Sequence, residues 1–462
     1  MSVSGPDPRE GISPPGPALP RVDPWQWREH LRREIRLPRE VERIPPHDAV
    51  GRELAEDLRS PEDLPALSIA AMDGFAVRRA DLVPGSLELP VSADIAARPG
   101  AVSALAPGTA ARIMTGAPVP EGADAVIEVE ATDADPFGPC PGTVALGLEA
   151  VPPPWRHVRR PGEEVPRGSA LAREGDRVGA GLLGIAQALG LEELPVLRPL
   201  RVAVVVTGDE LAGAARNEDR GEGTGALPVA GRTLAAGAVR ESNGAMLGAA
   251  LRVDGAEGTI LHSEDSHRRL RRVLEKAAEG HDLVVTTGGI GQGARDVVRT
   301  LLGELGAGTS RFEHIALRPG APQGAGRLPG GTPVIHLPGT PVGALVGYHL
   351  FVRPMLEGDR AEPRRILLGE DGRDAGPGTG RAATAAGHSA LTGADAVVRA
   401  LPARLRRDEQ GREVADLLPG RRLLPYARAD AIVLHGGRRR PTADRGVEGD
   451  AAAAVTVLVV QL

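Results

Sequence analysis

The sequence is short of cysteine, lysine and aromatic residues. Its 462 residues include one cysteine, Cys140, and one lysine, Lys276. A single cysteine excludes an intrachain disulfide framework and a zinc site built from several cysteines, and it favours a cytoplasmic setting. Because only three tryptophans, two tyrosines and four phenylalanines are present, the core must be built from Val, Leu, Ile and Ala. Few rings are left to stack on nucleic-acid bases.

Long apolar runs and an excess of positive charge are also missing. No stretch approaches the roughly 18 apolar residues of a membrane span, and the longest, residues 451–460, predicts a buried strand. The N-terminus is polar and rich in proline, without the apolar segment of a secretory signal. A net charge of −6 gives no footprint for nucleic acid. These features favour a chain of globular domains that binds neither membrane nor nucleic acid, and its length suggests about three of them.

Local patterns divide the first part of the chain into four segments. Residues 1–22 are rich in proline, glycine and charge, which predicts a disordered tail. Residues 23–59 carry apolar side chains at helical spacing. Residues 60–149 alternate short β-like runs with Pro/Gly turns, which predicts a small β-rich domain. Residues 150–198 hold a linker and then a helix, with Gly190 as its predicted C-cap.

From residue 200 to about 356 the pattern alternates strands with helices. The predicted strands are Arg201–Thr207, Gly258–His262, Asp282–Thr286, Ile315–Leu317 and Val334–Leu337. Apolar residues at i, i+3, i+4 and i+7 mark helices between these strands. This alternation is typical of a mostly parallel sheet with helices on both faces. The stretch 212–235 predicts a long loop, and short strands return from about 362 to the end.

Acidic residues and glycines follow three of these strands. They are Asp209 and Glu210, then Glu264 and Asp265, then the glycine-rich run from Thr286 to Gly293, which Asp296 follows. Parallel sheets bind ligands beyond the carboxyl ends of their strands. Backbone N–H groups of a glycine run approach phosphate closely, and several carboxylates beside a phosphate favour Mg²⁺. The structural alternatives are that Asp265 caps the next helix and that the glycines form ordinary turns.

Other motifs allow either a structural or a functional interpretation. Arg318-Pro319-Gly320 and Leu337-Pro338-Gly339 follow later strands, and they form either rigid turns or walls of the same cleft. In the β-rich part, Asp73 and Thr115 each stand among small residues, in segments that spacing alone predicts to be turns. The arginines of a basic run predict a solvated helix face; they are Arg268, Arg269, Arg271 and Arg272.

These segments resemble motifs of the molybdopterin molybdenumtransferases, the family of bacterial MoeA and of the gephyrin E domain. Residues 72–78 resemble the family's "AMDGYAVR", and residues 112–124 match its "RIMTGAPLPEGAD" nearly throughout. Residues 207–211 resemble its "STGDEL". Further matches follow in the family's order and include Ser242-Asn243, Thr287-Gly288-Gly289, Arg318-Pro319-Gly320, Leu337-Pro338-Gly339, Phe351–Pro354 and Tyr426–Asp430. The resemblance covers about residues 25–462.

The resemblance implies an α/β multidomain fold and a homodimer. Its central domain, a mostly parallel sheet that binds molybdopterin, would span residues 199–357. The helical stretches 23–59 and 150–198 would form one linker domain around the β-rich insert domain, residues 60–149. A C-terminal β domain would span residues 358–462.

The resemblance also implies a reaction. Molybdate is inserted into adenylylated molybdopterin, with Mg²⁺ present and with release of AMP. The implied catalytic residues are Asp73, Thr115, Glu210, Asp265 and Asp296, of which the last three would bind the metal. The implied substrate-binding residues are Arg159, Thr287, Gly288, Gly289, Arg318, Pro338 and Gly339. Asp73 and Thr115 would reach the cleft from the partner subunit.

The loops expected to handle anions depart from the family pattern. The family's "KPGKP" is replaced by residues 318–322, in which Arg318 changes one cation and Ala321 loses another. Its "GGVSVGDYD" is replaced by a run that contains Gly291 and Gln292. Two alternatives therefore stay open beside the insertase. One is a diverged relative that binds a pterin or nucleotide with weak or altered catalysis, and the other is a non-catalytic interaction protein.

Overall fold

A computed structural model describes most of the chain. The described residues are 21–212, 236–293, 296–358, 364–368, 397–420, 422–435 and 456–462. The predicted tail up to residue 20, and the predicted loop from residue 213 to 235, lie outside this part. The described residues form two compact units: residues 21–39 pack with the chain from Pro199 onward, and residues 40–198 form the second unit. No helix of the described residues is long and apolar enough to cross a membrane.

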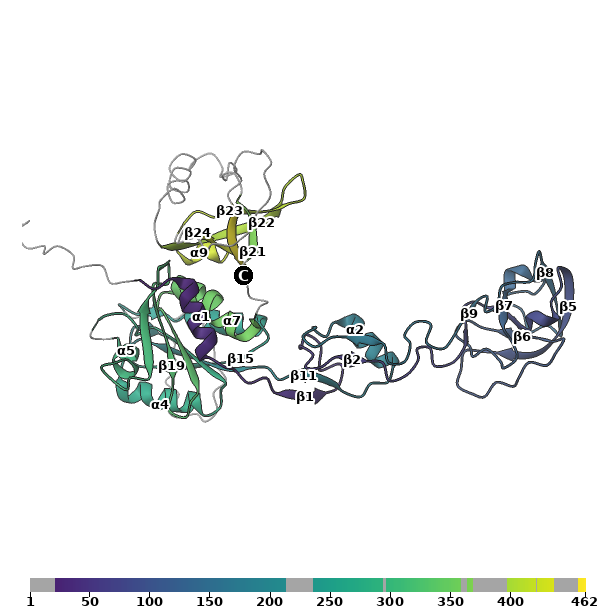
Figure 1. Ribbon diagram of the computed structural model, residues 1–462, viewed down its shortest axis with the longest axis horizontal. Coiled ribbons are helices and arrows are strands. Elements are labelled where there is room, and N and C mark those ends of the chain that lie inside the picture. The colour runs from purple at the N-terminus through teal and green to yellow at the C-terminus, as the bar shows by residue number, and fades with distance from the viewer. Residues whose placement is uncertain are drawn as a thin grey trace, which may run out of the picture. The chain divides into compact units, whose positions relative to one another are not determined.

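A six-stranded sheet forms the centre of the first unit (Figure 1). Its strands are β12 (Arg201–Thr207), β15 (Glu257–Ser263), β16 (Leu283–Thr287), β17 (Ser310–His314), β19 (Pro322–Arg327) and β20 (Pro333–Leu337). The spatial order is β15-β12-β16-β20-β19-β17, and only β19 runs against the others. The predicted mostly parallel sheet is therefore confirmed.

Two strands at one side of this sheet were not predicted from the sequence. β17 and β19 are glycine-rich or polar, so neither carries the apolar run that marks a buried parallel strand. The strand predicted at Ile315–Leu317 is wrong as a member of this sheet. The structure has a two-residue strand, β18 (Leu317–Arg318), which pairs with the C-terminal part of the chain instead.

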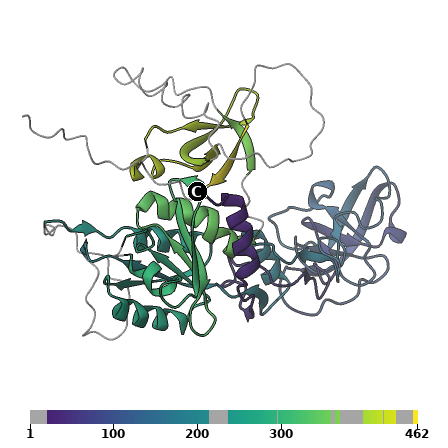
Figure 2. The same ribbon diagram turned by 60° about the vertical axis from the view of Figure 1, so that its left-hand side comes forward.

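Helices cover both faces of the sheet. Side chains alternate along each strand, so the apolar residues of one strand pack against helices on both faces. In β12, Val204 faces a core shared with α1 (Pro24–Glu34), α3 (Asn243–Val253) and α6 (Pro341–Gly347). Its neighbour Val205 faces a second core, shared with α4 (His267–Ala278) and α5 (Val297–Leu302). Figure 2 shows these elements around the sheet. The buried strands fix the place of every loop that leaves their carboxyl ends.

The first helix corrects the predicted domain boundary. We expected residues 23–59 to be helical and to join residues 150–198, but the helix ends at Glu34 and packs on the sheet through Trp27 and Leu31. Asp23 caps it by accepting hydrogen bonds from two backbone N–H groups. Val22 pairs with Ile315, so the tail predicted to reach residue 22 ends before it. An amphipathic pattern shows that one face is buried, but it does not show which partner buries that face.

The C-terminal strands form a second sheet, as the pattern of short strands predicted, and it belongs to the same compact unit as the central sheet. They are β21 (Arg364–Leu368), β22 (Val398–Arg407), β23 (Glu413–Leu417), β24 (Ala431–His435) and β25 (Thr456–Gln461), with the short helix α9 (Leu423–Tyr426) between the third and fourth. β22 pairs with both β23 and β24, so the five strands close into a ring, and β18 adds to its edge. β25 overlaps the second half of the apolar run 451–460, which predicted a strand.

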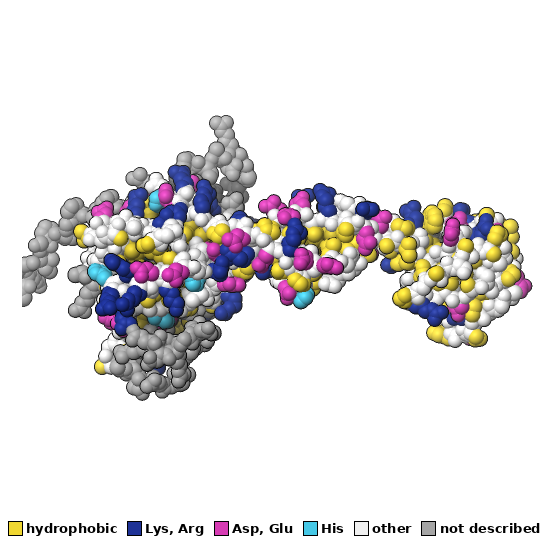
Figure 3. Space-filling view, turned by 90° about the horizontal axis from the view of Figure 1, so that it is seen from below, with side chains coloured by type: hydrophobic (Ala, Val, Ile, Leu, Met, Phe, Trp, Pro, Cys, Tyr) yellow, Lys and Arg dark blue, Asp and Glu magenta, His cyan; other side chains and the backbone are white. Residues whose placement is uncertain are grey.

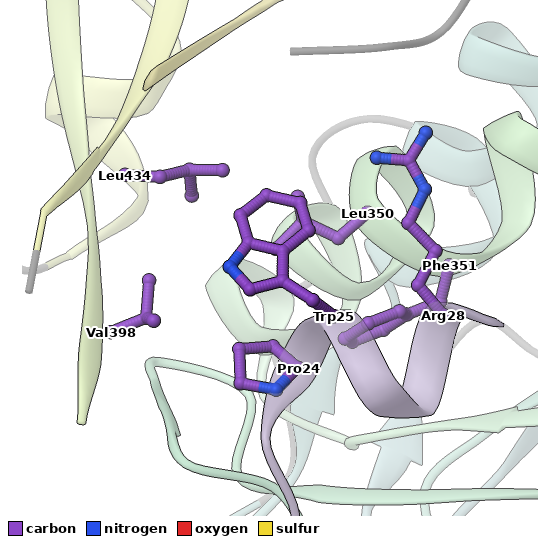
Figure 4. A pocket seen from close by; sticks show the side chains of 7 residues that line it. All are labelled: Pro24, Trp25, Arg28, Leu350, Phe351, Val398 and Leu434. Atoms are coloured by element: carbon purple, nitrogen blue, oxygen red, sulfur yellow. The ribbon is translucent and has the colours of Figure 1, made fainter. Parts of the chain in front are cut away.

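A narrow apolar seam lies where this sheet meets the helices of the unit. It lies between α1, a π-helix (Tyr348–Val352) and the ring of strands. Figure 4 shows Trp25 of α1 pointing toward Val398 and Leu434 across the seam. A last helix, α7 (Arg353–Glu357), follows the π-helix directly, and Arg353 bonds to the carbonyl of Gln461 in β25. Helix and strand contacts of this kind hold the C-terminal sheet on the unit.

The second unit contains a small mixed part and a β-rich part. The mixed part holds β1 (Val41–Ile44), β2 (Leu58–Arg59), β10 (Ala170–Ala172), α2 (Ala180–Ala188) and β11 (Leu194–Leu197). The expected helix around Leu54 and Leu58 is wrong, since Leu58 begins a strand and Leu54 forms a β-bridge. The predicted helix α2 is present, and Gly190 follows it with φ +63°.

The β-rich part agrees with the strands expected there. Its five-stranded sheet comprises β4 (Gly74–Val77), β5 (Gly85–Ile95), β6 (Ala110–Ile113), β7 (Ala125–Glu128) and β8 (Thr143–Leu148). A separate pair joins β3 (Ile69–Ala70) to β9 (Val158–Arg159). This pair places the start of the Asp73 segment beside Arg159, which lies 86 positions later in the sequence numbering.

Candidate functional site

The carboxyl ends of four parallel strands meet at one edge of the central sheet. Thr207 of β12 lies opposite Ser263 of β15, and Thr287 of β16 lies opposite Leu337 of β20. The segments that follow these strands therefore begin at the same edge. They are Gly208–Glu210, Glu264–Asp265, Gly288–Gly289 and Pro338–Gly339. The structure thus brings together most of the site residues expected in this unit.

A buried hydrogen-bond network joins the ends of β16 and β20 to the start of α3. The Thr287 hydroxyl donates to the Pro338 carbonyl at 2.9 Å. The Asn243 side-chain amide donates to the Thr287 hydroxyl oxygen at 2.9 Å and to the Gly339 carbonyl at 2.8 Å. Asn243 is the first residue of α3 and is buried. It was matched to a family motif but not expected in the site, because only the folded register brings it there.

The glycine-rich segment forms a tight loop that only glycine accommodates. Gly288 has φ +97° and Gly289 has φ +65°. A Cβ atom on Gly288 would lie 2.7 Å from the Thr207 hydroxyl oxygen. Farther along the loop, the N–H groups of Gly291 and Gly293 donate to the two carboxylate oxygens of Asp296 at 2.8 and 2.6 Å. Asp296 therefore shapes this loop from within.

Asp209 and Asp265 bind the turns after β12 and β15 to each other. The Asp265 N–H donates to the Asp209 carboxylate at 2.9 Å, and the Asp209 N–H lies 3.4 Å from the Asp265 carboxylate. Burial raises the pKa of Asp265, and the negative charges of Asp209, Glu210 and Asp296 raise it further. The cap of α4 is Ser266, so the alternative that Asp265 caps this helix is wrong. The strand ends form a cluster of negative charge beside the glycine loop.

The predicted metal site with three carboxylate ligands is not assembled here. Among the described residues, no three His, Cys, Asp or Glu side chains could hold one metal ion together. The physical reason at Asp296 is that both of its oxygens accept hydrogen bonds from the loop. The pKa of Asp265 is raised first by burial and then by the neighbouring carboxylates, both of which disfavour its charged form.

The segment around Arg318 lies beside the turn after β20. Gly320 has φ +106°, and a Cβ atom there would lie 3.6 Å from the Gly343 carbonyl of α6. The Gln323 side chain donates to the Gly320 carbonyl at 3.0 Å. Arg318 itself is exposed, and the carbonyl of Ala321 accepts a hydrogen bond from Ile315. The segment therefore packs against α6, the helix that follows the turn after β20.

The basic run of α4 lies close in sequence to this edge and faces solvent. Arg268, Arg269, Arg271 and Arg272 are all exposed. Figure 3 shows Lys and Arg side chains gathered over this face of the unit. The Arg269 guanidinium lies 3.9 Å from the Glu264 carboxylate. The prediction of a solvated helix face is confirmed.

In the second unit, Asp73 and Thr115 form a hydrogen-bonded pair on the surface. Thr115 donates both its backbone N–H and its hydroxyl to the same Asp73 oxygen, each at 2.6 Å. These two bonds, the hydroxyl bond foremost, hold the pKa of Asp73 below its usual value. Arg159 is exposed on β9, opposite Ile69. The structure thus places the three residues expected in this unit on adjoining segments.

A charged cluster beside Asp73 was not predicted from the sequence. The Glu128 carboxylate accepts a hydrogen bond from Arg156 at 2.7 Å and lies 3.2 Å from the His157 ring. Although burial acts to raise it, a backbone hydrogen bond and the bond from Arg156 keep the pKa of Glu128 below its usual value. Glu128 lies opposite Gly74 in the sheet. Neither spacing nor composition marks these residues, because they meet only through the pairing of β7 with β4.

Two family models match the chain, one in each part of the fold. A model described as "MoeA N-terminal region (domain I and II)" matches residues 25–190, and one described as "Probable molybdopterin binding domain" matches residues 203–358. The chain is 39% identical over 322 residues to molybdopterin molybdenumtransferase 2 of Mycobacterium tuberculosis. The match covers 68% of this chain and 74% of that protein.

Two further comparisons extend the likeness. The molybdopterin molybdenumtransferase of Synechococcus elongatus is 32% identical over 345 residues, which are 72% of this chain and 78% of that protein. The crystal structure of a molybdopterin biosynthesis MoeA protein from Pyrococcus horikoshii matches the fold with a TM-score of 0.69 at 24% identity. That match covers 96% of this chain and 99% of the other. The chain belongs to the molybdopterin molybdenumtransferase family.

Proposed function

We propose that this protein inserts molybdenum, supplied as molybdate, into adenylylated molybdopterin and releases AMP. The observation that carries the proposal is the carboxyl edge of the central sheet. There a glycine loop with Gly288 and Gly289 lies beside the acidic cluster of Glu210 and Asp265. Backbone N–H groups suit the phosphates of an anionic substrate, and the carboxylates suit a cation that accompanies them. Membership of the family supports the same reaction.

The residues of the edge would divide the work between binding and positioning. Gly288 and Gly289 would let the backbone approach the substrate, with Arg318, Pro338 and Gly339 as the opposite wall. Thr287 would hold this loop in place, since its buried hydroxyl donates to Pro338 and accepts from Asn243. Asn243 would keep the two sides at a fixed distance, because its amide donates to both of them. Asp296 would hold the glycine loop in its binding shape. Water would then cleave the phosphoanhydride, AMP would leave, and the dithiolene sulfurs would bind molybdenum.

We propose Mg²⁺ as the accompanying cation, bound by Glu210 and Asp265. Bound there, it would neutralise charge on the phosphate that leaves. A cation beside Asp265 would favour its ionised form, and so oppose the burial and the neighbouring negative charges that raise its pKa. The remaining ligands would be water and substrate phosphate, consistent with a protein site that offers no cage of three carboxylates among the described residues.

We further propose a homodimer in which Asp73, Thr115 and Arg159 of one copy serve the cleft of the other. The support is that these residues belong to a unit separate from the sheet edge and are exposed. A closed two-fold pairing would complete both clefts at once. We place the reaction in the cytoplasm, since the single cysteine suits a reducing compartment.

The test of this function is a direct assay of the purified protein. It is incubated with adenylylated molybdopterin, Mg²⁺ and a molybdate series, and both AMP release and protein-bound molybdenum cofactor are measured. We expect AMP release to require both Mg²⁺ and molybdate. Absence of AMP release at millimolar molybdate would contradict the proposed insertase activity.

The alternative of a diverged relative rests on Ala321, where the resemblance implies a lysine. Losing a cation at a partly buried anion site costs about ten- to hundredfold in affinity. We therefore expect half-saturation at a high molybdate concentration, lowered in the Ala321→Lys variant. Saturation at trace molybdate with no gain from Ala321→Lys would show that the missing lysine is irrelevant.

A further inference from the structure

The segment that carries Asp73 crosses between two pieces of β-structure. Ile69 and Ala70 form β3, which pairs with β9, whereas Gly74 begins β4, which pairs with β7. Asp73 lies in the three-residue crossing between them. Because Arg159 belongs to β9, the way these two pieces are held together sets the place of Arg159 relative to Asp73.

On the side of the five-stranded sheet, close backbone packing fixes the crossing. A Cβ atom on Gly74 would lie 2.0 Å from the Ile127 carbonyl oxygen of β7, so only glycine allows β4 to begin here. The Val129 N–H donates to the Asp73 carbonyl at 3.2 Å. The backbone of Asp73 is therefore held at the end of β7, where Glu128 lies.

On the side of β9, the crossing depends on an unusual loop. Of the described residues, Trp155 and His157 are the two non-glycine residues with positive φ, at 63° and 54°. Bulky side chains rarely adopt this left-handed conformation, because their Cβ atom crowds the backbone. The Ala71 N–H donates to the His157 carbonyl at 2.8 Å, so the crossing bonds to a strained residue. Such strain persists only where the surroundings impose it.

One carboxylate, that of Glu128, holds the side chains of this loop. It accepts a hydrogen bond from Arg156 at 2.7 Å through one oxygen, and its other oxygen lies 3.2 Å from Nε2 of His157. With Nε2 unprotonated, the His157 ring accepts from Arg156 at 3.1 Å, and with Nε2 protonated it donates to Glu128. The ring is therefore tied to this pair in both states.

The place of Glu128 in the sheet gives these contacts their consequence. Glu128 lies opposite Gly74 at the end of β7, and it reaches the two residues that directly precede β9. Its contacts thus join the strand that holds Asp73 to the loop that leads into Arg159. Two groups that serve one substrate need a fixed spacing, because a small misplacement lowers the rate strongly.

We propose that Glu128 is a positioning residue, which holds the loop before β9, and with it Arg159, in a fixed place against the Asp73 crossing. It acts through Arg156 and His157. The consequence for catalysis rests on the proposed function, in which Asp73 and Arg159 serve the same cleft. The hold on the crossing itself does not depend on any reaction.

The first measurement therefore follows the crossing in the full chain without substrate. Hydrogen–deuterium exchange at the Ala71 amide is compared between the unaltered protein and the Glu128→Ala variant. A partly exposed ion pair contributes about two- to fivefold to a local equilibrium, so we expect this amide to exchange faster by about that factor. Glu128→Gln keeps an acceptor for Arg156, and its exchange rate should lie between the two.

The matched control is Asp81→Ala. Asp81 is a carboxylate of the same β-rich part with a similar exposure, 19% against 22% for Glu128. It contacts Arg78 and the Gly108 N–H instead of the loop before β9. Exchange at Ala71 should be unchanged in this variant. The thermal unfolding midpoint should stay within about 3 °C in both, because each loses one partly exposed ion pair.

The second measurement is a double-mutant cycle on AMP release. Glu128→Ala should lower kcat by about tenfold and leave KM nearly unchanged, since a substrate still binds to groups that are out of register. In the Arg159→Ala background the same substitution should lower kcat no further, because the group to be positioned is gone. A general loss of folded protein would lower kcat equally in both backgrounds.

Unchanged exchange at Ala71 in Glu128→Ala would overturn the proposal, whether or not the protein releases AMP. Faster exchange combined with equal losses of kcat in the two backgrounds would also overturn it and make Glu128 a structural residue. Faster exchange in a chain that releases no AMP would contradict the proposed function and support the hold of Glu128 on the crossing.

Discussion

The residues at the edge of the central sheet and those around Asp73 are held in place by different means. At the edge, Asn243 is buried and bonds to Thr287 and Gly339, which lie 44 and 96 positions away in the sequence. Asp73 and Thr115 are exposed, and two hydrogen bonds from one residue hold the pair. The first arrangement is part of the fold, whereas the second lies on the surface of a completed sheet.

The difference separates two kinds of functional residue. Where binding groups are fixed by buried hydrogen bonds between distant segments, a substitution changes stability and activity together. Where they lie on the surface, a substitution changes activity and leaves stability nearly unaltered. Variants at the two places can therefore show whether the comparison holds.

The largest expected effect is at Asp296. The Asp296→Ala variant removes the acceptor of the Gly291 and Gly293 N–H groups, so the glycine loop loses its shape. A misplaced binding loop costs about a hundredfold in rate, and we expect at least this loss in steady-state AMP release. Glu264→Ala is the matched control, because Glu264 is also an acidic residue after a strand and only approaches Arg269. Equal activity in the two variants would contradict the role given to Asp296.

The next effect is on stability, at Asn243. The Asn243→Ala variant leaves the Gly339 carbonyl and the Thr287 hydroxyl without their donor. Unsatisfied buried polar groups cost about 1–3 kcal/mol each, so we expect a fall of this size in the free energy of unfolding, measured in urea. AMP release should fall with it. Full stability combined with lost activity would show that the edge is built like the Asp73 surface, and the comparison would fail.

Acid should affect the first unit through its buried histidines. Burial lowers the pKa of His336 to about 3, and its ring bonds to Thr286 and Ser310 across three strands. The folded pKa lies below the unfolded value of 6.5, so the stability it contributes is present above pH 6.5 and is lost as the pH falls toward 3.

The size of this acid effect follows from the same shift. Between pH 6.5 and pH 5 the loss from one such group is about 2 kcal/mol. Scanning calorimetry at pH 7 and pH 5 should show the transition of the first unit shifting more than that of the second. In a His336→Gln variant the pH dependence of that transition should become shallower, and an unchanged slope would rule out His336 as its source.

The smallest effect is expected at Thr115. The Thr115→Val variant removes the hydroxyl bond to Asp73 but keeps the backbone bond, so the pKa of Asp73 should rise toward its usual value. We expect AMP release to fall by about two- to tenfold, with its acidic limb shifted to higher pH. The urea unfolding curve should be unchanged. A destabilisation of the size expected for Asn243→Ala would contradict the surface character of this pair.

The parts of the fold that repeat a local pattern could be predicted from the sequence. The apolar run of β12 and the striped helix α4 were located from spacing alone, because burial on two faces or one face leaves a direct trace in the sequence. The partner of α1 could not be predicted, since its apolar face would fit any core. β19 was missed because its glycines and polar residues carry no strand pattern.

The candidate site was predictable as a set of residues but not as a geometry. Asp296 was expected among metal ligands, and the structure shows its oxygens bonded to the glycine loop. Asn243 enters through the packing of α3 on the sheet, and Glu128 enters through the pairing of β7 with β4. The positive φ of Trp155 has no signal in a tryptophan side chain. Each of these depends on the register between distant segments, which spacing along one segment does not contain.

The most direct test of the account uses a dimer with two different inactive subunits. Asp73→Ala and Asp296→Ala chains are co-expressed with different affinity tags, and the mixed dimer is isolated through both. If Asp73 of one copy serves the sheet edge of the other, one of the two clefts in this dimer is intact, and AMP release should recover to about half of the unaltered value. Each variant alone should stay inactive. A mixed dimer as inactive as its parents, or a chain that is monomeric at micromolar concentration, would contradict the account.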